Sequence, residues 1–113
     1  MLKEIKGNIK AVIQQKSSFT NEIGESESRW HGFAEPYGFL SMQSADSKYN
    51  NFNAKIEEST HVFLTEYDES IYALRYKDLR LICKGVFYDV LFVDNPDERD
   101  EQLEIYLRYV GGQ

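Results

Sequence analysis

The chain has 113 residues, enough for one domain, and a hydrophobic content of 42%, which argues against wholesale disorder. Its formal net charge of −6 argues against a protein that binds nucleic acid by neutralising phosphates, because that mode needs clustered lysine and arginine. Cys83 is the single cysteine, so an internal disulfide is excluded, and no apolar stretch is long enough for a signal peptide or membrane span. We therefore expect one soluble, cytoplasmic domain over residues 1–113.

The N-terminal part predicts two strands. Residues 9–19 alternate between apolar and polar positions and predict the first strand, although the spacing of Ile9, Val12 and Lys16 also fits a helix. The polar residues 20–28 predict a long hairpin connection. Residues 29–43 predict a second strand bent at a proline and a glycine. Its large apolar residues, expected to supply core or interface bulk, are Trp30, Phe33, Tyr37, Phe39 and Leu40.

A polar segment from Ser41 to Asn53 shows no apolar period and predicts a long flexible loop. Long loops inside small domains are often functional, and aromatic residues on a polar loop suit contact with a partner. A plain connection is the alternative interpretation. The candidate contact residues in this loop are Ser41, Met42, Asp46, Ser47, Lys48, Tyr49, Asn50, Asn51, Phe52 and Asn53.

The C-terminal half predicts a β-meander. Residues 61–65 are apolar on both faces and predict a central strand, whereas residues 68–78 predict a loop or short turn. Three further strands follow, separated by tight turns at Lys84–Gly85 and Asn95–Pro96. In the last strand, Leu103, Ile105, Leu107 and Tyr109 share one face. The residue pattern thus predicts a mainly β protein with little helix.

Residues able to carry chemistry are few. His31 and His61 lack metal-ligand spacing, and Cys83 lies in an apolar strand, so we interpret all three as structural. The acidic residues from Asp94 to Glu101 lack the pattern of a calcium loop and predict a solvated turn, and Glu57 and Glu58 would point to opposite faces of a strand. The sequence therefore predicts no catalytic, cofactor-binding or metal-binding residues; only a site assembled from distant residues would make the protein an enzyme.

Several segments resemble one known family. They are ADSKY at residues 45–49, NAKIEESTHVF at 53–63, YDV at 88–90 leading to VDNP at 93–96, and the ending LEIYLRYVGGQ at 103–113. These segments resemble the head closure proteins of tailed phages, also called head–tail joining or stopper proteins. The resemblance covers most of residues 30–113, while residues 1–28 match poorly. Where many members have Trp-Leu-Asp, this chain has Phe39-Leu40-Ser41.

The resemblance implies a small antiparallel β-barrel at the head–tail junction of the virion, made in the host cytoplasm. Such proteins form a homo-oligomeric ring below the portal and adaptor proteins, close the DNA channel after packaging, and offer a docking surface to the tail or tail terminator. The loop at residues 41–53 would face the channel, close to double-stranded DNA but without sequence-specific binding. The protein can be a monomer when it is isolated from the virion. The alternative function is that of a small β-barrel binding module, either an assembly chaperone or an oligonucleotide-binding fold. No enzyme activity, cofactor or membrane is implied.

Overall fold

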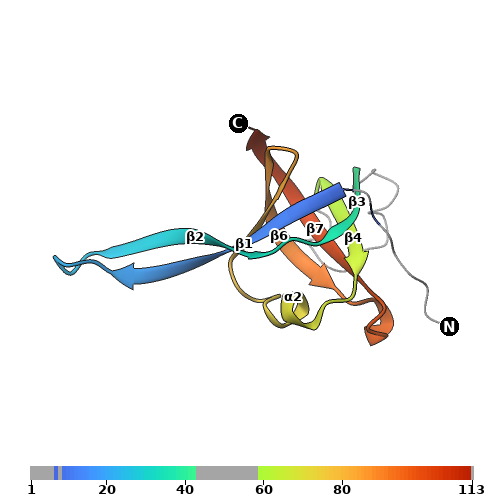
Figure 1. Cartoon of the computed structure of the whole chain (residues 1–113), viewed down its shortest axis with the longest axis horizontal. Coiled ribbons are helices and arrows are strands. Elements are labelled where there is room, and N and C mark those ends of the chain that lie inside the picture. Colours follow the sequence, from blue (N-terminus) through green and yellow to red (C-terminus); the bar gives the residue numbers. More distant parts are fainter. Residues whose placement is uncertain (1–6, 8, 43–58, 113) are drawn as a thin grey trace.

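The computed structural model describes residue 7, residues 9–42 and residues 59–112 (Figure 1). Within these residues seven strands form one antiparallel sheet, accompanied by a short α-helix and a 3-10 turn. The elements are β1 (Ile9–Thr20), β2 (Ser26–Ala34), β3 (Tyr37–Met42), β4 (His61–Glu66), α2 (Glu69–Ala73), β5 (Leu79–Cys83), β6 (Val86–Asp94), η2 (Pro96–Glu98) and β7 (Gln102–Gly112). The predicted mainly β class is confirmed.

The sheet closes on itself through β1. The strand order is β2-β1-β3-β4-β7-β6-β5, and β1 also pairs with β5. The start of β1 pairs with β3, where Ile9 is opposite Gly38, and its middle pairs with β5, where Ala11 is opposite Cys83. Six strands therefore form a ring, and this closure protects the sheet edges that an open sheet would expose.

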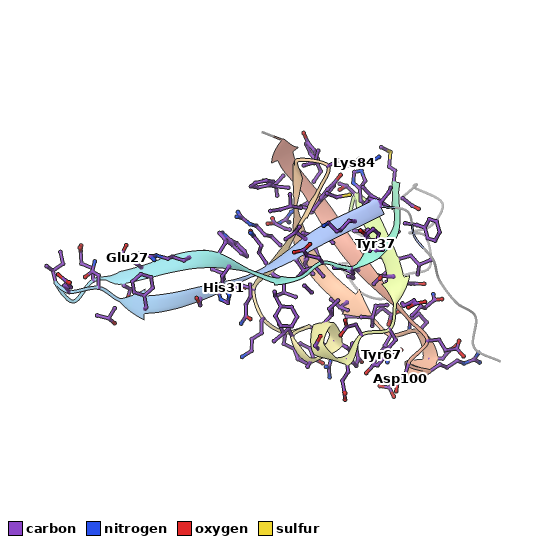
Figure 2. The ribbon with its side chains drawn as sticks, in the orientation of Figure 1. Glu27, His31, Tyr37, Tyr67, Lys84 and Asp100 are labelled. Carbon is purple, nitrogen blue, oxygen red and sulfur yellow. The ribbon has the colours of Figure 1, made fainter. Side chains whose placement is uncertain are left out.

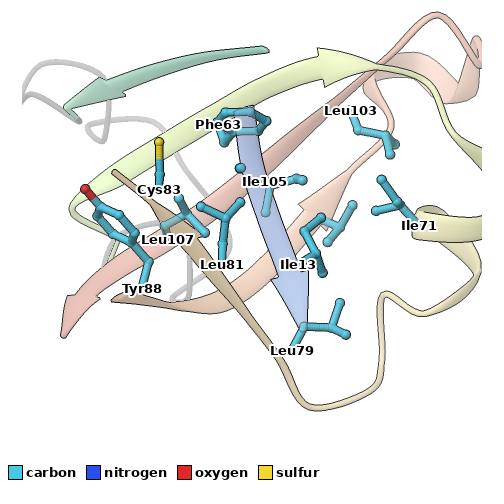
Figure 3. Close-up of a cluster of buried hydrophobic side chains, with 12 residues drawn as sticks. Ile13, Phe63, Ile71, Leu79, Leu81, Cys83, Tyr88, Leu103, Ile105 and Leu107 are labelled. Atoms are coloured by element: carbon cyan, nitrogen blue, oxygen red, sulfur yellow. The ribbon is translucent and has the colours of Figure 1, made fainter. Parts of the chain in front are cut away.

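The core fills the interior of this ring (Figure 3). Alternate residues point inward, as the period of two along the strands requires. Cys83 is buried here, as the sequence predicted, whereas Tyr109 shares the phase of Leu107 but is 53% exposed because it lies beyond the core. The buried apolar residues are Ala11, Ile13, Phe63, Ile71, Leu79, Leu81, Cys83, Tyr88, Val93, Leu103, Ile105 and Leu107.

Gly38 lets β3 pack closely on β4. A Cβ atom at this position would overlap the carbonyl oxygen of Leu64 and would lie 2.9 Å from the ring of Phe63. The sequence suggested that this glycine relaxes a bent strand. The structure instead shows that the neighbouring backbone leaves no room for a side chain.

The first predicted connection is shorter than expected. Residues 20–28 were predicted to be a loop, but only residues 21–25 turn, and β2 already begins at Ser26. The Asn21 side chain organises this turn, because its Oδ1 accepts hydrogen bonds from the backbone nitrogens of Ile23 (3.1 Å) and Glu25 (2.9 Å). A ribbon with water on both faces needs no apolar period, so the start of β2 at residues 26–28 was mistaken for part of the loop, whereas the first strand was predicted over residues 9–19.

The single strand predicted over residues 29–43 is in fact two strands. β2 ends at Ala34 and β3 begins at Tyr37, so the break includes the proline that was expected only to bend the strand. Pro36 supplies its carbonyl oxygen to the backbone nitrogen of Ala11 at 3.0 Å. β2 pairs with the outer half of β1, and β3 turns away to join the ring.

The predicted loop at residues 68–78 contains the helix α2. Asp68 caps it, because its side chain accepts a hydrogen bond from the backbone nitrogen of Ser70 at 2.9 Å. Ile71 is the buried residue of the helix and closes one end of the core. With only five residues, the helix is too short for an apolar period to show in the sequence.

We expect Asp68→Ala to lower the free energy of unfolding by about 1 kcal/mol, because the first helical turn loses its cap. Urea unfolding followed by circular dichroism measures this change. Asp68→Asn keeps a capping oxygen and serves as the control. If both variants lowered the free energy of unfolding equally, the capping hydrogen bond would not be the source of the loss.

Both predicted turns of the meander are confirmed. Lys84 and Gly85 have φ values of 52° and 77°, the left-handed pair that a tight hairpin requires. After β6, Asn95 holds the turn together, since its Nδ2 donates to Asp100 Oδ1 at 2.8 Å and its Oδ1 accepts from the Asp100 nitrogen at 3.1 Å. The predicted acidic turn follows β6 directly.

The hairpin of β1 and β2 projects from the ring and gives the molecule its elongated shape (Figure 1). The dimensions are 53 × 31 × 27 Å. In the described part of the chain, β2 hydrogen-bonds in the sheet to β1 alone. We call residues 16–30 the outer hairpin.

Candidate functional site

The predicted contact loop lies mostly outside the described residues. Ser41 and Met42 are the last two residues of β3, and Met42 is 77% exposed. The Glu57–Glu58 pair also falls outside the described residues. The partner role of the loop therefore stays a prediction. The candidate residues that fall outside are Asp46, Ser47, Lys48, Tyr49, Asn50, Asn51, Phe52 and Asn53.

The strands that flank this loop are firmly fixed. Met42 and His61 are register partners on β3 and β4, so the chain leaves and rejoins the sheet at neighbouring positions. Thr60 secures the return, because its nitrogen donates to the Leu107 carbonyl oxygen at 2.7 Å and its Oγ1 accepts from the Tyr109 nitrogen at 2.7 Å. The loop thus starts from a rigid end of the ring.

The two histidines lie apart, on β2 and β4. His61 packs edge-on against Tyr88 with ring centroids 5.0 Å apart, and its Nδ1 lies 2.9 Å from Thr60 Oγ1. Burial lowers the pKa of His61, which favours its neutral form. His31 is exposed on β2, directly after the outer hairpin (Figure 2). In the part of the chain that the structure describes, no three histidine, cysteine or acidic residues gather as a metal site.

Cys83 does not have the surroundings of a reactive thiol. It is 1% exposed within the core, and burial raises its pKa. A nucleophilic cysteine needs access and a lowered pKa. Its predicted structural role agrees with this environment.

An open hollow of about 750 Å³ lies at the base of the outer hairpin, and we call it the basal hollow. Lys16 and Trp30 line it from the hairpin, Tyr72 lines it from α2, and residues 75–79 line it from the segment that follows. Residues 89–94 of β6 and Arg108 of β7 complete the lining. Side chains from four distant parts of the sequence therefore meet in one concave surface.

Cations stack on aromatic rings along this hollow. The Arg75 guanidinium lies 4.1 Å from the Tyr72 ring centroid and 4.7 Å from that of Tyr76. Next to the hollow, the Arg80 guanidinium lies 4.5 Å from the centroid of Trp30. Such contacts hold charged groups in place on apolar surfaces. This cluster was not predicted from the sequence, because Lys16, Trp30 and Arg75 are far apart along the chain.

The far end of the basal hollow is acidic. Burial and the neighbouring charges of Glu104 and Asp97 raise the pKa of Asp94. Tyr106 lies beside it and donates a hydrogen bond from its hydroxyl to Glu104 Oε1 at 2.8 Å. Burial also raises the pKa of Tyr106, so its hydroxyl remains a donor at neutral pH.

We expect Asp94→Asn to raise the free energy of unfolding at pH 7. The raised pKa means that the ionised Asp94 side chain lowers the free energy of unfolding at neutral pH. This loss disappears as the pH falls through the raised pKa towards 3.8, the ordinary pKa of an aspartate, because the carboxyl group is then protonated. Urea unfolding at several pH values tests this: the gain should be present at pH 7 and lost below pH 3.8.

The control for this variant is Asp89→Asn, which removes an ion pair with Arg108 at 3.1 Å and is not expected to gain stability. A gain from Asp94→Asn that persisted unchanged in acid would contradict the electrostatic explanation.

Much of the predicted apolar bulk of β2 and β3 lies at the surface and not in the core. Phe33, Tyr37 and Phe39 are 39%, 58% and 42% exposed, while Trp30 and Leu40 are half-buried. Exposed aromatic residues are typical of protein–protein interfaces. Of the two predicted uses, core or interface, the structure favours the interface for the three exposed residues.

Together these features define a small, rigid β protein whose notable surfaces suit binding and assembly. The chain matches the family model described as Phage head completion protein over residues 3–108, and it belongs to this family. It is thus a structural phage protein that acts in completing the head. No curated protein matches the sequence significantly. Within the described residues, no helix is long and apolar enough to cross a membrane.

The match extends the resemblance found in the sequence. That resemblance began near residue 30 and left residues 1–28 without a counterpart, whereas the family match begins at residue 3. It therefore includes β1 and the whole outer hairpin.

Proposed function

We propose that this chain is a head–tail connector protein that closes the DNA channel of the capsid after packaging and provides the docking surface for the tail. The family match over residues 3–108 carries this proposal, because it includes five of the six ring strands in full and the first part of β7. A closed ring of strands is a rigid body, and rigid elements position binding surfaces well. The closing element is the loop at residues 41–53, which starts from the fixed end of β3.

The proposed setting is a homo-oligomeric ring at the head–tail junction, assembled in the host cytoplasm. The portal and adaptor proteins lie above it, and the tail or tail-terminator protein lies below. Exposed Phe33, Tyr37 and Phe39 support contacts with such partners. The isolated chain is proposed to be a monomer that forms the ring only on its partner.

The net charge of −6 supports a channel role without tight DNA binding. Like charge keeps DNA phosphates from adhering to the channel wall, so the wall holds the genome back without trapping it during ejection.

An oligonucleotide-binding module is the second candidate, and the basal hollow is the observation that favours it. Arginine and aromatic side chains on one surface can stack on bases and contact phosphates. Titration with single-stranded DNA at low salt separates the two functions. Tight, salt-sensitive binding would favour the module, and weak binding would favour the connector.

Deleting the gene from the phage that encodes this chain tests the connector role. We expect particles whose heads package DNA and then lose it, together with free, unattached tails. Nuclease sensitivity of the packaged DNA and electron microscopy of the lysate measure both effects. Supplying the intact chain from a plasmid should restore joined particles. Heads that keep their DNA and carry tails without the protein would overturn the proposal.

A further inference from the structure

The outer hairpin lacks the packing that usually stabilises a β-ribbon. Every residue from Lys16 to Thr20 is exposed, and so is every residue from Glu22 to Arg29. A two-stranded ribbon with no covering layer is only marginally stable in water. We propose that in the assembled ring the tip of the outer hairpin of one copy docks in the basal hollow of the next copy. This inference rests on the proposed ring.

The tip carries negative charge and one apolar anchor. Residues 21–27 contain three glutamates, Glu22, Glu25 and Glu27, and no lysine or arginine. Between them Ile23 is 78% exposed at the turn. Figure 2 shows Glu27 towards the outer end of the ribbon and His31 nearer its base. An acidic tip around an isoleucine calls for a receiving surface that is basic and apolar.

The basal hollow has these properties on the side that faces the hairpin base. Lys16, Arg75 and Lys77 supply positive charge, and Trp30 and Tyr76 supply apolar surface. Tyr76 is 86% exposed, which leaves its ring available to an incoming side chain. Aromatic and arginine residues are the side chains that most often dominate binding energy in interfaces. The hollow also contains three aspartates: Asp78 follows Lys77 along the chain, and Asp89 and Asp94 lie on β6. The side near the hairpin base therefore has three cations, Lys16, Arg75 and Lys77, against one aspartate.

The hairpin cannot fill the hollow of its own chain. Lys16 lines the hollow, and the turn begins five positions further along the chain at Asn21. At about 3.3 Å per residue, the tip stands roughly 17 Å beyond the hollow. A contact between the hairpin tip of one copy and the basal hollow of another joins two different surfaces of the protein. Repeating such a contact builds a ring when the rotation closes.

Disulfide cross-linking within assembled particles tests this contact. A chain carrying both Ser26→Cys at the tip and Asp78→Cys in the hollow should form covalent dimers and a ladder of larger oligomers on mild oxidation. The matched control pairs Ser26→Cys with Glu66→Cys, an exposed position on β4 outside the hollow. Cys83 is buried and stays unchanged. Equal, weak ladders from the two chains would overturn the inference.

Charge reversal gives an independent measurement. Glu25→Lys is expected to lower the yield of the cross-linked ladder about fivefold, and Lys77→Glu should do the same, because each places like charges together. The double variant should recover most of the yield. Two single losses without recovery in the double variant would contradict direct pairing of these surfaces.

The outcomes also separate this inference from its premise. If the protein is present in particles but no tip-to-hollow ladder forms, the docking is wrong and the connector role stands. If the protein is absent from particles, the connector role fails and the docking fails with it. Protection of the Asp78→Cys thiol by DNA, with no ladder, would assign the hollow to nucleic acid and overturn the docking.

Discussion

Phe63→Ala is expected to lower the free energy of unfolding by about 3–5 kcal/mol, enough to unfold much of a marginally stable domain. Phe63 is 0% exposed on β4, and its ring lies where Gly38 lets β3 approach. Removing the ring leaves a cavity beside a backbone that is already closely packed. Urea unfolding measured by tryptophan fluorescence and circular dichroism gives the change.

Two companion variants make this measurement specific. Ile23→Ala removes an apolar side chain that is 78% exposed and should change the free energy of unfolding by less than about 0.5 kcal/mol. Gly38→Ala should destabilise the fold strongly, because the new methyl group overlaps the Leu64 carbonyl oxygen. A loss for Phe63→Ala no larger than that for Ile23→Ala would contradict the placement of the core.

Replacing residues 43–53 with a short Gly–Ser connection is expected to abolish DNA retention while leaving the protein folded. The fold should persist because Met42 and His61 are register partners and the removed residues lie between their strands. Loss of retention follows from the proposed closing role of the loop. The measurements are the nuclease sensitivity of packaged DNA and the infectious titre after complementation.

The aromatic residues of this loop are tested separately. Tyr49→Ser with Phe52→Ser keeps the length of the loop and removes its proposed partner contacts, so we expect a smaller loss than excision causes. A folded excision variant that retained DNA like the unaltered chain would show that this segment does not close the channel.

The ring strands were largely predictable from the sequence because one of their faces is buried. The period of two gave the phases of β1 and β7, and the turns at Lys84–Gly85 and Asn95–Pro96 marked where strands end. Each of these signals is local along the chain. The pairing of β1 with β5, which closes the sheet, joins residues about seventy positions apart and has no such local signal.

The outer hairpin and the basal hollow were not predictable for different reasons. The hairpin has water on both faces, so its polar residues 26–28 resembled a loop although they begin β2. The break at Pro36 was mistaken for a bend. The hollow is assembled from Lys16, Trp30 and residues near Arg75, which only the folded ring brings together. The predicted loop at residues 41–53, in contrast, remains the candidate for closure.

The most direct measurement is cryo-electron microscopy of mature particles from the phage that encodes this chain. We predict a ring of copies at the head–tail junction, between the portal–adaptor assembly and the tail. In that ring each outer hairpin should contact the neighbouring copy. Density for this protein in the tail tip, or its absence from mature particles, would contradict the connector role.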